Sequence, residues 1–346
     1  MGRKNISIKK ALFPPFSTTQ MVMRRAKDVR IADPDVILKR AEELADRWKL
    51  FRRRFDGVRD SEDPAFILHD IGSSEEERVQ WLFLIDTLNY SFWPNPGEPA
   101  WTVEYGGRKW SGYWGLAASL KRAYEEGFPL TDASFISKIS EDDLRYIFRG
   151  EGMIPLFQSR VAHLREIGRV LLEQWDGDVV SMIYSAGQSA ERLVNLIVTY
   201  FPSFRDEVIY GDEKIRVFFW KRAQLYVADI YTMFSGQGLG EFHDIDVLTA
   251  FADYKLPQVL RALGILEYSE ELANQVDNRI PLQPGDQKEI EIRAATVQAV
   301  ELLSEAMETI TGDPVFAVQM DQFIWYLGQD DAFRKNPYHL CRTVFY

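Results

Sequence analysis

Three segments of the sequence set polar or ionisable side chains into apolar and aromatic surroundings, a combination that small-molecule sites commonly use. The first is the run at 85–93, which Asp86 and Asn89 interrupt. If this run forms a site, Phe92 and Trp93 stack on a flat ligand, while Asp86 and Asn89 fix its polar edge. The alternative is the end of a buried helix, where the same two polar side chains cap backbone groups. The residue pattern alone leaves both interpretations open.

The second segment, at 219–229, combines two charges with apolar neighbours. In a helix, Lys221, Leu225 and Asp229 lie on one face because they are four residues apart. As part of a site, Lys221 would hold an anionic group as a point charge. The more common alternative is a lysine that extends its charge into solvent, beside a solvated aspartate.

The third segment, at 248–260, places Asp253 between apolar residues shortly before Pro257. Because proline disfavours the helical conformation at the preceding residue, we expect Leu256 to be extended. Asp253 then lies at a junction between two helices, where backbone N–H groups are free to bind a carboxylate. Asp253 is predicted to be the N-cap of the helix that begins near Pro257, a catalytic carboxylate, or both.

Most other catalytic motifs are absent. Neither a GxxxxGK[ST] loop nor a GxGxxG loop follows a predicted strand, so phosphate-loop and dinucleotide-binding sites lack their main support. Cys341 is the only cysteine, and it lacks the helix-start context that would activate it as a nucleophile. The histidines are scattered, without the spacing of metal ligands: His69, His163, His243 and His339. We therefore expect no metal and no cofactor, which leaves the chemistry of carboxylates and lysines.

The elements that must position these side chains are mostly helical. Capping residues and apolar residues three or four positions apart predict helices at 34–55, from 75, from 141, and at 156–174, 179–200, 286–310 and 314–328. Short hairpins are predicted at 101–110, with a Gly-Gly turn, and at 208–219. The absence of alternating strands and helices argues against a doubly wound nucleotide-binding sheet. The predicted fold class is mainly α, as one domain or as two intimately packed helical lobes.

Composition and charge limit the classes of partner. The chain has 346 residues, 46% of them hydrophobic, and a net charge of −11. Seven of its 41 basic residues but none of its 52 acidic residues precede residue 28, so the remainder has a net charge of −18. Repulsion from phosphates argues against broad nucleic-acid binding. The apolar stretches are shorter than the roughly 18 residues of a membrane span.

We therefore expect a small-molecule substrate as the partner, with neither stable nucleic-acid binding nor membrane insertion. A single cysteine forms no internal disulfide, which favours a reducing compartment and a cytoplasmic location. The sequence does not determine the oligomeric state.

Residues 1–22 differ from the rest because they are basic, lack acidic residues and contain Pro14-Pro15. We expect this N-terminal extension to be disordered, or to reflect an alternative start at Met21 or Met23, and to lie outside the folded domain at 23–346. The alternative is a transit-like or basic anchoring peptide, which the weak Arg-rich periodicity of the segment disfavours.

Taken together, the three segments and their neighbours resemble the queuosine salvage protein family, the queuosine 5′-phosphate N-glycosylases. The motifs that carry this resemblance follow one another along the chain: Asp86–Trp93, Ser111–Trp114, Lys221–Gln224, Phe251–Tyr254, Leu256–Leu260 and Glu291–Arg293. They span nearly the whole chain after the N-terminal extension. Lys255 stands where the family pattern leads us to expect arginine.

The resemblance implies hydrolysis of the C1′–N bond of queuosine 5′-monophosphate, with release of queuine and ribose 5-phosphate. It also implies a helical fold related to the helix-hairpin-helix DNA glycosylases, although Gly238-Leu239-Gly240 only loosely suggests the hairpin. By this analogy Asp253 is the catalytic carboxylate, which stabilises an oxocarbenium-like sugar and activates water. Lys221 is the other catalytic candidate and our first choice for the contact to the 5′-phosphate.

The remaining predicted site residues would bind the substrate. The aromatic side chains Phe92, Trp93 and Trp114 would stack on the planar base, while Asp86 and Asn89 would bind its polar edge. Three further substrate contacts are predicted: His69, on the base or its diol, Asp229 and Tyr254. The main alternative function is a non-catalytic binding module for queuine or a 7-deazaguanine nucleotide. A glycosylase that acts on tRNA or DNA is disfavoured by the charge of −18 on residues 28–346.

Overall fold

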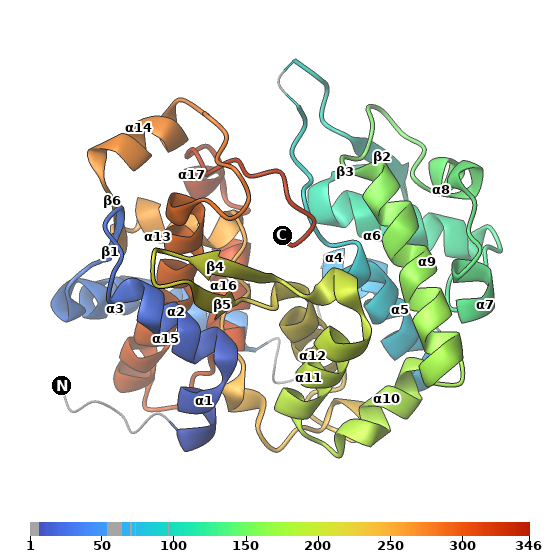
Figure 1. The fold of residues 1–346 in the computed structure, drawn as a ribbon, viewed down its shortest axis with the longest axis horizontal. Coiled ribbons are helices and arrows are strands. Elements are labelled where there is room, and N and C mark those ends of the chain that lie inside the picture. The colour runs from blue at the N-terminus through green and yellow to red at the C-terminus, as the bar shows by residue number, and fades with distance from the viewer. Residues whose placement is uncertain (1–6, 54–63, 70, 73, 96) are drawn as a thin grey trace.

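The structure is a computed structural model that describes residues 7–53, 64–69, 71–72, 74–95 and 97–346. In these residues the chain is mainly helical with short antiparallel strand pairs, which confirms the predicted fold class (Figure 1). The helix-hairpin-helix comparison stays a prediction; Gly238–Gly240 forms a short 3-10 helix, η2.

The long helices surround two large hydrophobic cores. We call the first the central lobe; its core includes residues from α5 (Glu75–Thr87), α6 (Gly112–Glu125), α9 (Phe157–Gln174), α10 (Val179–Ala186), α11 (Ala190–Tyr200) and α12 (Lys221–Met233). We call the second the terminal lobe; its core includes residues from α3 (Pro34–Arg52), α13 (Lys255–Ala262), α15 (Gln287–Thr311) and α16 (Ala317–Leu327). The chain begins in the terminal lobe, builds the central lobe and returns, and its C-terminal end lies between the two (Figure 1).

The shorter helices complete the lobes. In the terminal part of the chain they are α1 (Ile8–Leu12), α2 (Pro14–Met23), α14 (Glu270–Asp277) and α17 (Asp331–Arg334). In the central part they are α4 (Pro64–His69), α7 (Ala133–Ile136), α8 (Glu141–Ile147) and the 3-10 helices η1 (Pro202–Phe204) and η3 (Ile245–Val247).

Local capping chemistry explains several helix boundaries. The Ser74 hydroxyl accepts a hydrogen bond from the Glu77 N–H at 3.2 Å at the start of α5, and Ser140 begins α8 with a capping box. The helix predicted at 179–200 is instead two helices. Gly187 adopts a left-handed conformation that ends α10, and Ser189 caps α11, so the chain turns between them.

Both predicted hairpins are present. Strands β2 (Thr102–Tyr105) and β3 (Arg108–Ser111) pair around Gly106-Gly107, and β4 (Glu207–Tyr210) pairs with β5 (Ile215–Phe218). A third pair, β1 (Val29–Ile31) with β6 (Leu266–Tyr268), was not predicted. Its strands have three residues each and are far apart in sequence, so no turn between them gives a local signal from which the pair could be predicted.

The described part of the N-terminal extension is folded, in contrast to the predicted disorder. α2 packs against α15 and β5, and it buries Phe16 and Val22. The Thr18 hydroxyl accepts a hydrogen bond from the Phe218 N–H at 3.1 Å. These apolar contacts outweigh the basic composition on which the prediction rested, so the segment contributes to the body of the protein from residue 7 onward.

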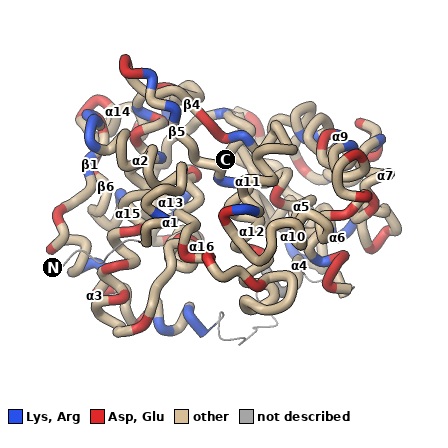
Figure 2. The backbone as a smooth tube through the Cα atoms, turned by 60° about the horizontal axis from the view of Figure 1, so that its bottom comes forward, with Lys and Arg blue, Asp and Glu red and all other residues tan. Residues whose placement is uncertain are grey.

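Acidic and basic residues occur together over both lobes in the view of Figure 2. Across the described residues, none of the helices combines the length and the apolar character that a bilayer span requires.

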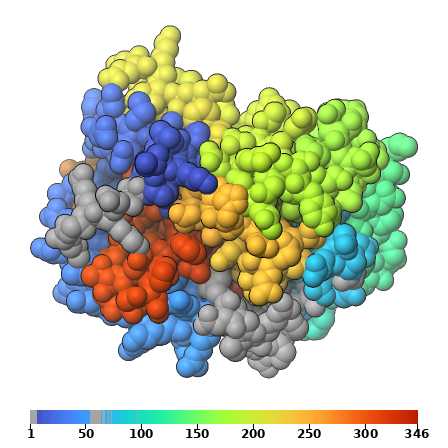
Figure 3. All heavy atoms as spheres, turned by 90° about the horizontal axis from the view of Figure 1, so that it is seen from below, coloured from blue at the N-terminus to red at the C-terminus, as the bar shows by residue number. Residues whose placement is uncertain are grey.

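The connection from α12 to α13 brings the two lobes together. Seen from below, this segment lies between the surfaces of the central and terminal lobes (amber in Figure 3). Phe251 belongs to the core of the central lobe and Leu256 to that of the terminal lobe. Asp253 therefore lies between the residues that join the two cores.

Candidate active site

Four buried or partly buried carboxyl groups interact electrostatically with one lysine at the boundary of the lobes. Burial lowers the pKa of Lys221, and the charges of Asp253, Asp86 and Asp321 oppose this shift. Burial also raises the pKa of Asp229, and the charge of Lys221 lowers it. Because such effects fall off with distance, these side chains form one electrostatic cluster. We call these five residues the carboxylate–lysine cluster.

Lys221 is the first residue of α12, and its side chain is only 5% exposed. Its Nζ donates a hydrogen bond to the Asn89 carbonyl at 3.1 Å, in the turn that follows α5. Its backbone N–H donates to Asp206 Oδ2 at 3.3 Å. The lysine therefore turns inward, contrary to the solvent-extended alternative that the sequence left open.

Asp253 is 9% exposed and accepts two backbone hydrogen bonds at the start of α13. Its Oδ1 receives the N–H of Lys255 at 2.7 Å and that of Leu256 at 2.9 Å. Burial raises the pKa of Asp253, while Lys221 and these two N–H groups lower it. The N-cap residue of α13 is Tyr254, so the predicted N-cap position of Asp253 is wrong by one residue. One carboxylate oxygen of Asp253 still binds the first two N–H groups of the helix, and the carboxyl group remains part of the cluster.

The prediction that Leu256 is extended is wrong, because Leu256 is the second residue of α13. Pro257 is then the third helical residue, within the first turn, where an N–H has no partner inside the helix. Asp253 accepts the two preceding N–H groups, and this hydrogen bonding supports the helical conformation at Leu256 despite the proline that follows it.

Asp86 lies in the last turn of α5 and is fully buried. Within the described part of the chain, neither of its carboxyl oxygens has a partner at ordinary hydrogen-bond geometry, although the Asn89 side chain lies close enough to lower its pKa. Burial raises its pKa well above the ordinary value, and the charge of Asp229 raises it further. A buried polar group without a partner is uncommon, and in a cluster of this kind it indicates a position for a polar group of a ligand.

Asp229 lies two turns after Lys221 on the same helix, as the spacing predicts. Burial raises the pKa of Asp229 to about 7, and Lys221 opposes the shift. Asp229 therefore changes its charge near neutral pH.

We expect Asp229→Asn to change how stability depends on pH. Between about pH 4 and pH 7 the folded protein keeps a proton on Asp229 that the unfolded chain has lost. The stability from this group is therefore present at acidic pH and is lost as the pH rises to about 7. In scanning calorimetry, the melting temperature of the variant minus that of the wild type should increase from pH 4 to pH 8.

Asp277→Asn is a control of opposite sign, because hydrogen bonding to Arg261 lowers the pKa of Asp277. Its melting temperature relative to the wild type should fall as the pH rises toward the ordinary aspartate pKa, and it should stay constant at higher pH. A difference for Asp229→Asn that stays constant or falls with pH would contradict the raised pKa.

Aromatic side chains and His69 form one wall of the cluster. The Tyr113 hydroxyl and His69 Nε2 are 2.7 Å apart, and the Trp114 ring centroid lies 5.9 Å from that of His69. Burial raises the pKa of Tyr113, with contributions from Asp229 and Asp86, which places this wall beside the two carboxyl groups. Burial lowers the pKa of His69 to about 4, so its imidazole is neutral at neutral pH.

Phe92, Trp93 and Tyr254 are linked to the cluster through arginines. The Arg160 guanidinium lies 5.4 Å from the centroid of Phe92, and that of Arg342 lies 3.5 Å from the centroid of Trp93. Burial raises the pKa of Tyr254, with Asp253 among the groups that add to the shift, whereas Arg160 and Arg342 lower it. Tyr254, which follows Asp253 in the chain, therefore lies within electrostatic range of both arginines.

The structure adds residues that the sequence interpretation missed. Asp321, on α16, accepts the Phe251 N–H at 2.7 Å, and its pKa is raised well above the ordinary value by burial. A single aspartate in the apolar stretch 317–327 was a signal of the same kind as Asp253. Two aromatic residues near the site carried no such signal in the sequence. They are Trp325, whose ring centroid lies 5.5 Å from that of Trp114, and Tyr338, whose ring centroid lies 5.0 Å from that of Tyr254.

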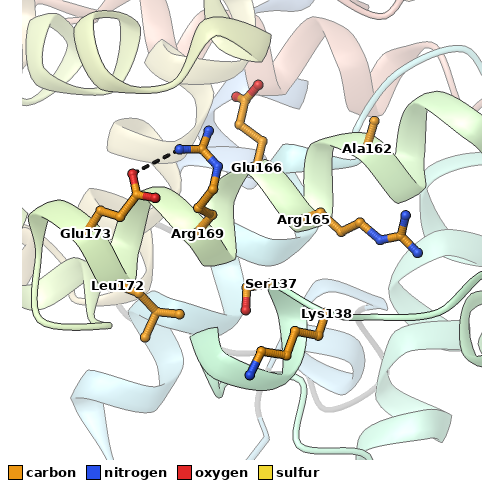
Figure 4. Close-up of a pocket in the computed structure, with 8 residues that line it drawn as sticks. All are labelled: Ser137, Lys138, Ala162, Arg165, Glu166, Arg169, Leu172 and Glu173. Atoms are coloured by element: carbon orange, nitrogen blue, oxygen red, sulfur yellow. Dashed lines mark hydrogen bonds and ion pairs between the residues drawn. The ribbon is translucent and has the colours of Figure 1, made fainter.

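A surface pocket of about 490 Å³ lies on another part of the central lobe, along α9 and beside the end of α7 (Figure 4). Its lining carries three cationic side chains, of Lys138, Arg165 and Arg169, and two carboxylates. Arg169 and Glu173, four residues apart on α9, form an ion pair at 2.9 Å (Figure 4). None of its lining residues belongs to the carboxylate–lysine cluster, so it contributes nothing to the candidate site.

The fold and the site together define a mainly helical protein whose two lobes enclose a lysine among acidic side chains. The family model described as queuosine salvage protein matches residues 68–346. The chain therefore belongs to the queuosine salvage protein family.

Curated relatives match over most of their length, and all carry the name queuosine 5′-phosphate N-glycosylase/hydrolase. A protein of Sphaerobacter thermophilus is 42% identical over 336 residues, which are 95% of this chain and 97% of the relative. A protein of Mus musculus is 38% identical over 81% of this chain and 86% of its own length. A protein of Bos taurus is 34% identical over 97% of this chain and 99% of its own length.

Proposed function

We propose that this protein hydrolyses the N-glycosidic bond of queuosine 5′-monophosphate and releases queuine and ribose 5-phosphate, as a step of queuine salvage for tRNA modification. The observation that carries the proposal is the buried pair of Asp253 and Lys221 at the lobe boundary. The printed name of a relative that is 42% identical over 95% of this chain supports the choice of substrate.

The reaction requires stabilisation of a cationic sugar and activation of water. The C1′–N bond breaks with its electron pair on the base, and the sugar becomes oxocarbenium-like. We assign to the Asp253 carboxylate the stabilisation of this charge and the acceptance of a proton from the attacking water. The nitrogen that held the sugar gains a proton from solvent, and Asp253 returns to solvent the proton that it accepted from water, so that the overall reaction adds one water. Because a 7-deazaguanine lacks N7, stabilisation on the sugar side carries more of the catalysis than in purine nucleosides.

Lys221 is assigned a role beside the reacting sugar. Its Nζ already donates a hydrogen bond to the Asn89 carbonyl, and among the neighbouring carboxyl groups its charge interacts most strongly with Asp253, which would repel a phosphate dianion. This arrangement favours the reacting sugar over the 5′-phosphate as the substrate group nearest to Lys221. In the free protein the lysine keeps Asp253 more acidic than burial alone would allow.

The base would lie on the side of the cluster formed by Asp86 and the aromatic residues. The unpartnered carboxyl group of Asp86 would bind polar groups of the base, together with Asn89. Stacking surfaces would come from Trp114 on one wall and from Phe92 and Trp93 on the other. Three side chains complete the proposed substrate site: His69, Asp229 and Tyr254.

The proposed partner is the nucleotide itself, without stable nucleic-acid binding and without a cofactor, in the cytoplasm. The net charge of −18 on residues 28–346 disfavours a long polyanion. One small nucleotide requires only a local complement of charge, which the mixed distribution in Figure 2 allows.

The direct test is to incubate the purified protein with queuosine 5′-monophosphate and to follow the products by chromatography and mass spectrometry. We expect free queuine and ribose 5-phosphate in equal amounts. Tight binding without release would instead support the binding-module alternative, and absence of both binding and release would refute the substrate. Salt-dependent binding to tRNA would favour a nucleic-acid substrate.

A further inference from the structure

Arg293 belongs to the Glu291–Arg293 motif, to which the proposed chemistry gives no role. It projects from α15 of the terminal lobe and is 3% exposed. Glu291 in the same motif has a structural function, because its Oε2 accepts the N–H groups of Lys27 and Asp28 and its Oε1 accepts the Tyr210 hydroxyl. Arg293 contacts different segments, and these are the segments that carry the catalytic candidates.

One contact of Arg293 reaches the segment of Asp253. Its Nε donates a hydrogen bond to the Ala252 carbonyl at 3.0 Å. The Ala252 carbonyl belongs to the peptide bond that leads directly into Asp253. The position of Arg293 along α15 therefore helps to set where the Asp253 backbone lies.

The other contacts of Arg293 reach the start of α12. Nη1 and Nη2 donate to the two carboxylate oxygens of Asp206 at 2.9 and 2.5 Å. The same carboxylate accepts the Lys221 N–H, and the Asp206 carbonyl accepts the N–H groups of Phe219 and Trp220. Asp206 thus binds the first residue of α12 and the two residues before it, and Arg293 binds Asp206.

Aromatic rings and a second carboxylate restrict the guanidinium further. Its carbon lies 3.8 Å from the centroid of Phe219 and 4.3 Å from that of Tyr346. Glu289 lies 3.7 Å from Nη1 and accepts the Tyr346 hydroxyl at 2.8 Å. A planar guanidinium can make these contacts at the same time, whereas a lysine ammonium offers no fork of fixed geometry.

We propose that Arg293 is a positioning residue that sets the separation of Lys221 and Asp253 across the boundary of the two lobes. The proposal rests on the proposed hydrolysis. Arg293 acts through Asp206 on the start of α12 and through the Ala252 carbonyl on Asp253. Its effect therefore falls on the arrangement of the catalytic pair, while the base-binding side with Asp86 and Trp114 stays unchanged.

The test is Arg293→Lys, which keeps the charge and removes the fork. We expect kcat for queuosine 5′-monophosphate to fall about 100-fold, the effect of a displacement of about 1 Å at a catalytic pair, with KM within about threefold of the wild type. A crystal structure of the variant should show Ala252 and Asp253 displaced relative to the start of α12.

Arg261→Lys is the matched control. The two terminal nitrogens of Arg261 also donate hydrogen bonds to the two oxygens of one carboxylate, that of Asp277, at 2.6 and 3.1 Å. Its guanidinium also lies near an aromatic ring, 4.8 Å from the centroid of Tyr268. It projects from α13, the helix that follows Asp253, but away from the cluster. This control should keep kcat and KM within about twofold, because its contacts join no catalytic candidate.

A second variant, Asp206→Asn, tests the same link from the other side and should also lower kcat with little change in KM. An Arg293→Lys variant that folds and keeps its kcat would overturn the proposal. The proposal would also be overturned if Arg293→Lys and Asp206→Asn both failed to fold while Arg261→Lys folded, because Arg293 would then contribute to stability alone. Wild-type protein without hydrolysis would refute the proposed function, and the crystal structure of Arg293→Lys would then decide the positioning separately.

Discussion

Replacing Asp253 by asparagine should reduce kcat for queuosine 5′-monophosphate on the order of 1000-fold, the scale at which a positioned acid–base group contributes. The amide oxygen lacks the negative charge that stabilises an oxocarbenium-like sugar, and it is a poor proton acceptor. The fold should survive, because this oxygen can still accept the N–H groups of Lys255 and Leu256, which Oδ1 of Asp253 receives at 2.7 and 2.9 Å. Turnover is measured by the release of queuine, and binding of queuine by calorimetry.

Asp244→Asn provides a matched control, because Asp244 is also a buried aspartate at a helix start. Its Oδ1 accepts the Ala190 N–H at 2.6 Å and its Oδ2 the Ser189 hydroxyl at 2.7 Å. This variant should lose some thermal stability and keep its kcat. If Asp253→Asn retains most of its turnover, Asp253 has no part in the chemistry. If it loses queuine binding as well, its role extends beyond the reacting sugar.

Replacing Lys221 by methionine should lower kcat at neutral pH by about 100-fold and shift the pH profile. Lys221 is the cation that opposes the upward pKa shift that burial gives to Asp253. Without this cation the pKa of Asp253 rises further, and its carboxylate form is reached only at higher pH. The acidic limb of the plot of kcat against pH should therefore move to higher pH. Steady-state kinetics from pH 5 to pH 9 measure both effects.

Lys10→Met is the control for the loss of an inward-facing lysine. The Lys10 ammonium pairs with Glu301 at 2.8 Å and donates to the Leu248 carbonyl at 3.2 Å, outside the cluster. It should affect the melting temperature and leave the pH profile in place. An unshifted acidic limb in Lys221→Met would show that Lys221 does not set the ionisation of Asp253, and an unchanged kcat would remove it from the catalytic pair.

Local signals in the sequence predicted many elements because their causes are local. Ser140 and Asp143 form the predicted capping box, and Gly106-Gly107 forms the predicted turn between β2 and β3. The spacing of Lys221 and Asp229 placed both on one face of a helix, which is a property of helical geometry alone. Where a local signal was misread, as at Gly187, one predicted helix became two.

Long-range packing decided what these signals could not. The strand pair of β1 and β6 and the packing of α2 on α15 join segments that are far apart in the chain. The sequence interpretation also omitted Asp321, because a single aspartate in an apolar helix does not indicate which residues lie opposite it. Its contact with the Phe251 N–H exists only because α16 packs beside the α12–α13 connection.

By itself, the sequence determined the helical class, the boundaries of several of the longer helices and of two hairpins, and the individual residues with chemical potential, among them Asp86, Lys221 and Asp253. The tertiary structure decided how these residues are used. It buries Asp86 without a partner, directs Lys221 inward toward the Asn89 carbonyl and links the starts of α12 and α13 through Arg293. The physical reason is that burial and neighbouring charges set the pKa of an acidic or basic group, and both depend on contacts between residues distant in sequence.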